Sequence, residues 1–447
     1  MKASLLLILA APLAAPLAAQ DPLSLKDAVE RALAKHPSIE AARQGVKAAE
    51  MGVAESRSGY LPKLNYAESW QRSNNPVFVF SSLLTQHQFD ASNFQLGPLN
   101  RPDALNNFQS QLTLDEVVFD AGQTRRAVRS AELGRDITGE DERRNRMNVI
   151  AGVVRAYHGA VLAAEGVKVA GEALRSAEAD LNRAKTVRAA GMSTDADVLS
   201  IQVHLAAMRE QQIRRNADWE VALAALNEAI GLPLSEAHEL RTPLTAVAID
   251  NRGLAAYEKD GVETRPDLRQ SRLQTSLAET QSESARAAML PQVILHAGFE
   301  ADRQRFVNRG GANWLAAATL RWNIFNGGAD KARIEQAASG LGRARALGTQ
   351  AEAQVRLQVR RAWADLRSAT ERIGVAEGAV TMAEESLRIT KNRFDAGLAT
   401  VTDLLRTETA LLEVRDRRLA AVYDQRLAAV NLELASGRLS PTSEVLN

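Results

Sequence analysis

The residue types that most often carry out chemistry are absent or scattered in this sequence. The 447-residue chain has no cysteine, which excludes thiolate metal sites, disulfides and a cysteine nucleophile. It also has no phosphate-binding loop and no nucleophile elbow. No two histidines stand at metal-ligand spacing on one helix, and the six are His36, His87, His158, His204, His238 and His296. We therefore predict no catalytic, metal or cofactor site, and a protein that is not an enzyme.

The charge balance excludes a further class. The chain has 55 Lys+Arg against 54 Asp+Glu, whereas a nucleic-acid binder is clearly basic. Most carboxylates stand among arginines at helical spacing, which is typical of a solvated helix face. With only 4% aromatic residues, the composition favours long helices over compact α/β cores. We predict an elongated, helix-rich protein that binds no nucleic acid.

The start of the chain has the pattern of a signal peptide. Lys2 precedes an apolar run at 5–9, and a Pro- and Ala-rich stretch ends near Ala19. The sequence predicts a signal peptide over 1–19, the alternative being an anchor that is retained. No run of eighteen apolar residues follows residue 20, so we expect no membrane-spanning helix. Any segment that enters a membrane is then a strand.

The chain is an internal duplication. A single shift of 206 residues aligns more than a hundred residues, and the matched pairs include Phe119 with Phe325, Leu181 with Leu387, Leu199 with Leu405 and Arg209 with Arg415. Upstream the shift is 229, as for Pro37 and Pro266, so the first copy carries 23 extra residues before Phe119. A period this long means two copies of a half-protein.

Each half is predicted to contain a helix, two strands, a long helix and a further helix. The first repeat spans 20–231, with strands at about 61–72 and 108–119, a long helix at 122–190 and a helix at 194–230. The second spans 265–437, with strands at about 291–301 and 314–325, a long helix at 328–396 and a helix at 400–436. Residues 232–264 form a link and 438–447 a C-terminal tail. Each long helix would measure ~100 Å at about 1.5 Å per residue.

The strands alternate apolar and polar residues. Trp314 and Trp322 lie on one apolar face, ~26 Å apart along a strand, or ~20 Å across a bilayer at a tilt of about 40°. We expect them, with Trp70, to form the aromatic girdles of an outer-membrane barrel. Glu68 and Glu116 interrupt the apolar faces, so either they lie beyond the hydrocarbon layer or the register slips there. The alternative is a soluble sheet with one wet face.

The number of strands determines the assembly. In hydrocarbon every backbone polar group needs a partner, and four strands of ~10 residues cannot close on themselves. Several chains must therefore share one barrel. Two copies would give eight strands and a core filled by side chains, whereas three would give twelve strands and room for a pore.

At this point the sequence resembles a known family. Exits from the strands into the long helices at 119–122 and 325–328, and helical turns at 190–199 and 396–405, are similar to those of the TolC-like outer-membrane efflux proteins. The resemblance implies a homotrimer in the lipid of the cell outer membrane, with a twelve-stranded barrel and an α-helical coiled-coil tunnel through the periplasm. It also implies a periplasmic adaptor and an inner-membrane pump as partners. The chain would be the exit duct of a tripartite efflux or type I secretion system.

The two helical turns are the candidate site. Gly191 and Gly397 stand where a left-handed cap ends each long helix, and Thr194 and Thr400 can cap the next helix. Three residues on, Asp197 and Asp403 complement the helix dipole, which is a purely structural interpretation. By resemblance these turns dock the adaptor and form the periplasmic gate.

Further gate residues also follow from the resemblance. Asp403 matches an aspartate that lines the constriction, and Phe394 matches an aromatic of the closing network. A threefold ring of carboxylates attracts cations. Arg406 and Ala399 depart from the family pattern, so a second ring is not expected. The alternative is that Arg393, Asp395 and Arg406 form ion pairs that hold the tip closed.

Three matters have more than one interpretation. Residues 73–107 are predicted to form an external loop whose phenylalanines pack on one another or over the barrel mouth. The competing interpretation of the whole chain is an exported soluble coiled-coil scaffold or periplasmic adaptor. Drugs, metal ions and polypeptides all remain possible cargoes, because a passive conduit carries little of the pump's specificity.

Overall fold

The computed structural model describes residues 21–191, 193–248, 252–307 and 310–447. The predicted signal peptide over 1–19 lies outside the described residues, as do Met192 in the first helical turn and Asp250 in the predicted link. The chain forms two compact units. Unit 1 comprises residues up to 40, 144–265 and 355–447, and unit 2 comprises 41–143 and 266–354.

The elements repeat along the chain. The first half contains β1 (Asp21–Leu23), α1 (Leu25–Lys35), α2 (Pro37–Arg57), β2 (Lys63–Ser73), α3 (Pro76–Thr85), α4 (Leu96–Asn100), β3 (Leu105–Phe119), α5 (Gln123–Ala189) and α6 (Asp195–Ile230). The second half contains β4 (His238–Leu240), α7 (Leu254–Thr264), α8 (Pro266–Ala287), β5 (Gln292–Arg303), β6 (Gly311–Arg321), α9 (Ala329–Asp395) and α10 (Val401–Ala435). Both α5 and α9 have 67 residues, and both α1 and α7 have 11.

The second repeat begins earlier than the predicted residue 265, because α7 repeats α1. Helix α7 lies inside 232–264, which was predicted only as a link, and it precedes Pro266 as α1 precedes Pro37. Proline at the first position of α2 and of α8 suits a helix start, because that residue has no intrahelical N–H partner to lose. Helix α1 begins with a capping box between Ser24 and Asp27.

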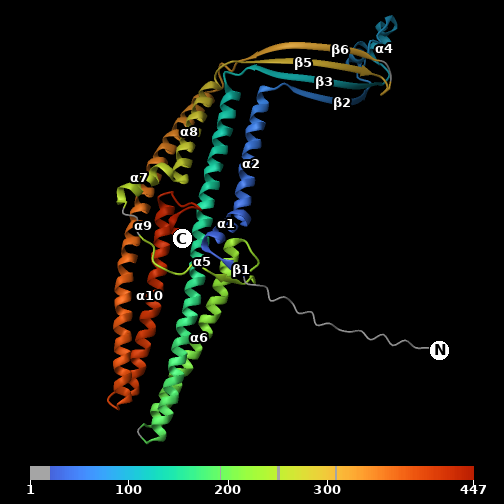
Figure 1. The fold of residues 1–447 in the computed structure, drawn as a ribbon. Helices are drawn as coiled ribbons and strands as arrows, with labels where there is room; N and C mark the ends of the chain where they lie inside the picture. The colour runs from blue at the N-terminus through green and yellow to red at the C-terminus, as the bar shows by residue number, and fades with distance from the viewer. Residues whose placement is uncertain (1–20, 192, 249–251, 308–309) are drawn as a thin grey trace, which may run out of the picture. The chain divides into compact units, whose positions relative to one another are not determined.

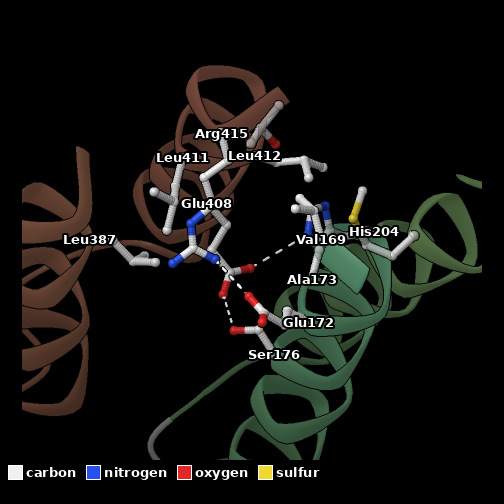
Figure 2. A pocket seen from close by; sticks show the side chains of 12 residues that line it. Val169, Glu172, Ala173, Ser176, His204, Leu387, Glu408, Leu411, Leu412 and Arg415 are labelled. Carbon is white, nitrogen blue, oxygen red and sulfur yellow. Dashed lines mark hydrogen bonds and ion pairs between the residues drawn. The ribbon is translucent and has the colours of Figure 1, made fainter. Parts of the chain in front are cut away.

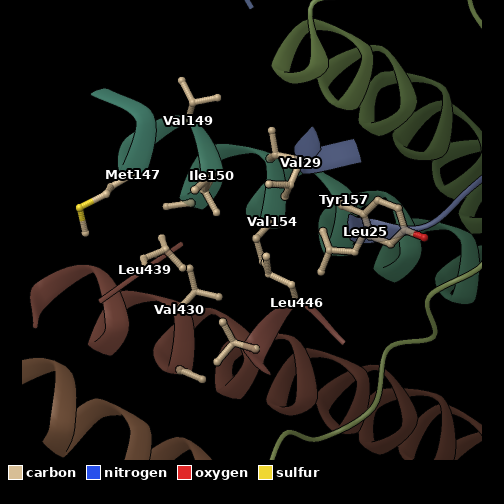
Figure 3. Close-up of a cluster of buried hydrophobic side chains, with 14 of the residues drawn as sticks. Leu25, Val29, Met147, Val149, Ile150, Val154, Tyr157, Val430, Leu439 and Leu446 are labelled. Atoms are coloured by element: carbon tan, nitrogen blue, oxygen red, sulfur yellow. The ribbon is translucent and has the colours of Figure 1, made fainter. Parts of the chain in front are cut away.

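Unit 1 contains the main hydrophobic core. Helices α1, α5, α6, α9 and α10 contribute its buried side chains, of which Figure 3 shows a part. At its centre the hydroxyl of Tyr157 donates to the carbonyl of Leu23 (2.8 Å) and accepts from the N–H of Thr242 (2.9 Å). The aromatic side chain thereby ties β1 and the segment after β4 to α5, where those two short strands pair in parallel.

Among the helices that the structure describes, α5 is the one that is both long enough and, in one window, apolar enough to cross a membrane by length and composition. The window has eighteen residues, although the sequence contains no unbroken apolar run of that length after residue 20. Half of that window is buried in the fold, where Val153, Val154 and Tyr157 have no exposed surface. Burial of this kind is what a core helix requires.

Unit 2 contains a four-stranded antiparallel sheet in the order β2-β3-β5-β6 (Figure 1). The three strands β2, β3 and β5 lie within three residues of their predicted bounds. The fourth strand, predicted over about 314–325, begins three residues earlier at Gly311 and ends four residues earlier at Arg321, so its predicted end is wrong. A bulge between Val117 and Phe119 shifts the register where β3 leaves the sheet.

The connection between β2 and β3 is more ordered than the predicted external loop. It contains α3 and α4, and α3 starts with Asn75 as a side-chain cap. The prediction that its phenylalanines pack on one another is confirmed: the rings of Phe80 and Phe89 are 4.7 Å apart, and those of Phe89 and Phe94 are 5.1 Å apart.

Candidate functional site

Both long helices end in a left-handed glycine. The φ angle is +75° at Gly191 after α5 and +71° at Gly397 after α9. In the second turn, the N–H of Leu398 donates to the carbonyl of Arg393 (2.8 Å) and that of Gly397 donates to Phe394 (3.0 Å). These bonds satisfy carbonyls that a helix end leaves unpaired. Any side chain with a Cβ would be strained at either glycine.

A capping box follows each glycine. The hydroxyl and the N–H of Thr400 donate to Asp403 Oδ2 over 2.7 and 3.1 Å, and the N–H of Asp403 donates back to Thr400 Oγ1 over 3.2 Å. Thr194 and Asp197 repeat this arrangement with distances of 2.7, 3.0 and 3.2 Å. The bonds to Thr400 and Thr194 lower the pKa of Asp403 and Asp197, so both carboxylates are charged at neutral pH. The structural interpretation of both aspartates is therefore confirmed, and the gate role remains a prediction.

Of the three charged tip residues expected to form ion pairs, Asp395 is the one with an ion pair in the described part of the chain, and its partner lies in α5. Asp395 pairs with Arg183 of α5, whose Nη1 lies 2.5 and 2.7 Å from the two carboxylate oxygens. Arg393 donates to the carbonyl of Leu398 (3.3 Å), and Arg406 acts at longer range by lowering the pKa of Asp403 after the stronger effect of Thr400. The Arg183 contact joins the hairpin α5–α6 to the hairpin α9–α10.

Apolar side chains pack the two hairpins together near the turns. Phe394 and Leu405 are half-buried and lie against a cluster drawn from α5, α6 and α10, which comprises Ala177, Leu181, Ala184, Val198, Ile201, Leu205 and Val401. Phe394 thus belongs to an apolar contact within one chain.

A buried polar cluster lies farther along the same hairpins. Asp180 of α5 is 1% exposed and lies one helical turn after Ser176, whose hydroxyl bonds to Glu408 of α10, so the carboxyl groups of Asp180 and Glu408 are neighbours and interact electrostatically. The ammonium of Lys391 of α9 is 3.0 Å from Asp180 Oδ1 but off the hydrogen-bonding direction, so neither Asp180 oxygen accepts a hydrogen bond. Glu408 accepts from Ser176 (2.9 Å), and His204 Nε2 of α6 is 3.5 Å from its other oxygen (Figure 2).

A cavity of about 230 Å³ adjoins this cluster. Figure 2 shows Glu408 between Ser176 and His204, with the Arg415–Glu172 ion pair (3.1 Å) beside it. Apolar side chains from all four helices complete the wall, namely Val169, Ala173, Met208, Leu387, Leu411 and Leu412.

Sequence reasoning missed the cluster because its members lie up to 232 residues apart. One signal was present. Asp180 stands inside an apolar helical stripe formed by Ala177, Leu181 and Ala184, where a carboxylate is costly unless it has a partner.

The sheet of unit 2 has one apolar and one polar face. Paired residues of an antiparallel sheet share a face, and Trp70 pairs with Phe108 while Phe299 pairs with Trp314. Leucines and alanines fill the positions between them, and Trp314 is 80% exposed. The other face carries hydrogen-bonded polar pairs, which include Asp115 with His296 (2.7 Å), Gln109 with Glu300 (3.2 Å) and Asn107 with Asp302 (2.6 Å).

Glu68 lies on the apolar face in the predicted register. It forms an ion pair with Arg303 (2.9 Å) and accepts hydrogen bonds from Tyr66 and Ser110. Glu116 likewise shares the face of Leu295, before the bulge. The suggestion of a register slip at these two residues is therefore wrong.

Trp322 lies beyond the end of β6, so the predicted distance of ~26 Å between Trp314 and Trp322, which assumed one continuous strand, does not apply. Its indole N–H donates to the carbonyl of Met289 (3.1 Å), just before β5 begins. Trp322 therefore lies at the helix-proximal end of the sheet, whereas Trp70 lies toward the α3 end. The girdle assignment stays a prediction. Within the described ranges, no group of three His, Asp or Glu residues could hold a metal ion.

Comparison with known proteins identifies the class. The family model described as "Outer membrane efflux protein" matches residues 28–232 and 261–438. The chain is 27% identical to Protein CyaE of Bordetella pertussis, covering 94% of this chain and 85% of that protein. It is 24% identical to the alkaline protease secretion protein AprF of Pseudomonas aeruginosa, covering 93% and 85%.

Solved structures share the fold. A crystal structure of CusC matches with a TM-score of 0.80 and 17% identity, covering 94% of this chain and 93% of that one. The Campylobacter jejuni CmeC outer membrane channel matches with a TM-score of 0.79 and 18% identity, covering 94% and 87%.

The chain belongs to the outer membrane efflux protein family. The resemblance to TolC-like proteins is thereby confirmed, as is the predicted fold class of a mainly α chain with strands of the barrel portion. The protein is an outer-membrane channel component of an efflux or secretion system, and its cellular place is the outer membrane. The alternative of a soluble scaffold or adaptor is not supported.

Proposed function

We propose that three copies of this chain form one continuous duct, with a twelve-stranded barrel in the outer membrane and a helical tunnel in the periplasm. The duct docks to a periplasmic adaptor through the turns at Gly191 and Thr194 and at Gly397 and Thr400. An inner-membrane pump supplies the cargo, and the duct conducts it passively.

The sheet of unit 2 carries this proposal. Its outer strands β2 and β6 each pair on one side only in the described part of the chain, and one face is apolar. An open edge in hydrocarbon leaves several backbone groups unsatisfied, so neighbouring copies must pair with it. Eight strands would enclose a lumen filled by side chains, whereas twelve leave space beside the polar face of Asp115, Glu300 and Asp302.

The helices support a closed ring independently. Val169 and Ser176 of α5 face the second hairpin within one chain, since they line the cavity between the hairpins. Their counterparts in the repeat, Val375 and Met382 of α9, are about 70% exposed. The surface of α5 that packs on the second hairpin therefore has a repeat-related surface on α9 that has no packing partner within the described part of the chain.

The complementary surface is exposed as well. Leu405 packs on the first hairpin, whereas its counterpart Leu199 of α6 is 60% exposed. Val203 and Ile213 of the same helix are about 70% exposed. Two different surfaces of one chain that fit each other make a heterologous interface, which generates a ring when the rotation closes.

A cysteine pair tests the ring. Ser176 and Glu408 are hydrogen-bonded inside the chain, so their counterparts Met382 and Gln202 should touch between copies. Because the chain has no cysteine, Met382→Cys with Gln202→Cys should give only disulfide-linked dimers and trimers after mild oxidation in membranes. Met382→Cys with Glu220→Cys is the matched control and should stay monomeric on the gel. Absence of linked trimers with the first pair would overturn the ring.

The names of the relatives point to different cargoes. AprF and PrtF are named for protease secretion, and OpmQ of Pseudomonas aeruginosa for pyoverdine export. We propose that the pump selects the cargo and that Asp403, with Phe394, Arg393, Asp395, Arg406 and Asp197 around it, forms the periplasmic gate. The capping boxes make these carboxylates fixed charges at the turns, as a cation-attracting ring requires.

A further inference from the structure

We propose that Asp180 and Glu408 form a proton-binding site that latches the two helical hairpins of each chain together. The latch is closed when the two carboxyl groups share one proton and weakens when that proton leaves. The site lies within one chain and does not depend on the proposed function. Only its predicted effect on conduction rests on the proposed gate.

The geometry defines the site. Asp180 is 1% exposed and the side chain of Glu408 is 9% exposed, and they come from α5 and α10 on opposite sides of the contact between hairpins. Two carboxylates this close and this buried cannot both be charged without a large cost, whereas a shared proton turns repulsion into a hydrogen bond. The oxygens of Asp180 accept no other hydrogen bond, so a proton is the partner they lack.

Charged groups from every packed helix face the pair. Lys391 of α9 supplies one positive charge beside Asp180, and His204 of α6 lies against Glu408. Arg415 of α10 is engaged by Glu172 of α5 (3.1 Å) and by Glu384 of α9 (2.8 Å). With one shared proton, the carboxyl pair and Lys391 are neutral together. Without it, the pair carries one uncompensated negative charge between the hairpins.

The titration falls in an accessible range. Burial, followed by the neighbouring Glu408, raises the pKa of Asp180 to about 6. Burial alone would raise the pKa of Glu408 as well, but hydrogen bonds from His204, Asp180 and Ser176 lower it below its ordinary value. The pair therefore loses its last proton near pH 6 and keeps one negative charge below that pH.

The sign of the effect follows from linkage. The folded pKa of Asp180 is above its ordinary value of 3.8, so the stabilisation is full below about pH 4 and is lost as pH rises through 6. For Glu408 the folded pKa is lowered, so its stabilisation is present above about pH 4.5 and is lost only in strong acid. Between pH 5 and 7, the equilibrium constant for separating the hairpins should rise about tenfold and then level off.

Hydrogen exchange of the complete protein in detergent measures this opening without requiring conduction. Peptides covering 171–191 and 384–399 should exchange about tenfold faster at pH 7 than at pH 5, after correction for the intrinsic pH dependence. Asp180→Asn keeps the shape and mimics the protonated form, so its exchange should be slow and the same at both pH values. Glu178→Gln, an exposed acid on the same helix, should keep the tenfold change and is the control.

A second variant covers the case in which Asp180→Asn does not fold. Glu408→Gln removes the neighbouring negative charge and offers Asp180 an amide donor, so the pH response should become clearly smaller than tenfold, although the burial of Asp180 remains. A tenfold response that persists in either folded variant, or no response in the unmodified protein, would overturn the site. In planar bilayers the open probability should be lower at pH 5 than at pH 7. A protein that shows the exchange response but no conduction at all would refute the proposed duct and leave the proton site standing.

Discussion

The ion pair between Arg183 and Asp395 is predicted to hold the periplasmic end of each chain closed. It is the contact nearest the turns that joins the two hairpins through charge, with both carboxylate oxygens within 2.7 Å of one guanidinium nitrogen. Asp395→Ala should therefore favour separation of the hairpins.

The exposure of the pair sets the magnitude. The two side chains are 40% and 43% exposed, so water screens them and each pair contributes about 0.5–1 kcal/mol. If three copies open together, the closed state loses about 1.5–3 kcal/mol. Since 1.4 kcal/mol is a factor of ten, the ratio of open to closed states should rise roughly 10- to 100-fold.

Single-channel recording of the purified protein in planar bilayers measures that ratio. Arg183→Ala and the double variant should open as often as Asp395→Ala, because each change removes the same contact. Arg188→Ala is the matched control: Arg188 pairs with Asp195 over 2.5 Å, but both residues belong to the hairpin α5–α6. The ion pair does not hold the tip closed if the two single effects add in the double variant, or if Arg188→Ala opens the channel equally.

Three further outcomes are expected. Asp403→Asn keeps an acceptor for the capping box while removing its charge, so it should weaken block by cations, and thermal stability should fall only slightly because the lost charge complements the helix dipole. Asp197→Asn is the comparison in the first turn. Gly437→Ala should lower the free energy of unfolding by about 1–3 kcal/mol in denaturant titration, because φ is +72° and a Cβ would lie 2.7 Å from Thr264 Oγ1. Gly340 lies inside a helix with open space around it, so Gly340→Ala should raise the free energy of unfolding by about 0.5–1 kcal/mol. Tyr157→Phe should cost about 1–3 kcal/mol in the same assay, since the part-buried N–H of Thr242 loses its acceptor and the carbonyl of Leu23 keeps only the N–H of Arg241.

Local rules made the repeated elements predictable. The long helices lie within a residue of their expected bounds at each end, because glycines with positive φ and capping threonines mark those ends in the sequence. Period-two alternation located all four strands of the sheet, and it failed only at the C-terminal end of β6. There Trp322 continues the apolar pattern, but its indole bonds to the carbonyl of Met289 and the ladder has already ended at Arg321.

Contacts distant along the chain were not predictable. Arg183 and Asp395 are 212 residues apart, and nothing in either helix marks one as the partner of the other among many arginines and carboxylates. The pairing of β1 with β4 depends on three residues each, too few for a periodic signal. Helix α7 was not predicted, because its charged, glycine-containing sequence is typical of a link. The 229-residue shift that relates the two halves does align it with α1.

The duplication predicts how many proton sites the assembly holds. If the contact between copies repeats the contact within a chain, each member of the buried cluster has a counterpart 206 residues away. For Ser176, Asp180, His204 and Glu408 the counterparts are Met382, Ser386, Ala410 and Gln202. None of these four titrates, so the contacts between copies lack the carboxyl pair, and a trimer holds three sites rather than six. Between pH 7 and 5 the unmodified trimer should therefore bind about two to three more protons than Asp180→Asn in a potentiometric titration, since each site fills by about 0.8 over that range. A difference of about five protons would mean that the two kinds of contact are alike, and no difference would mean that Asp180 is not the group that titrates.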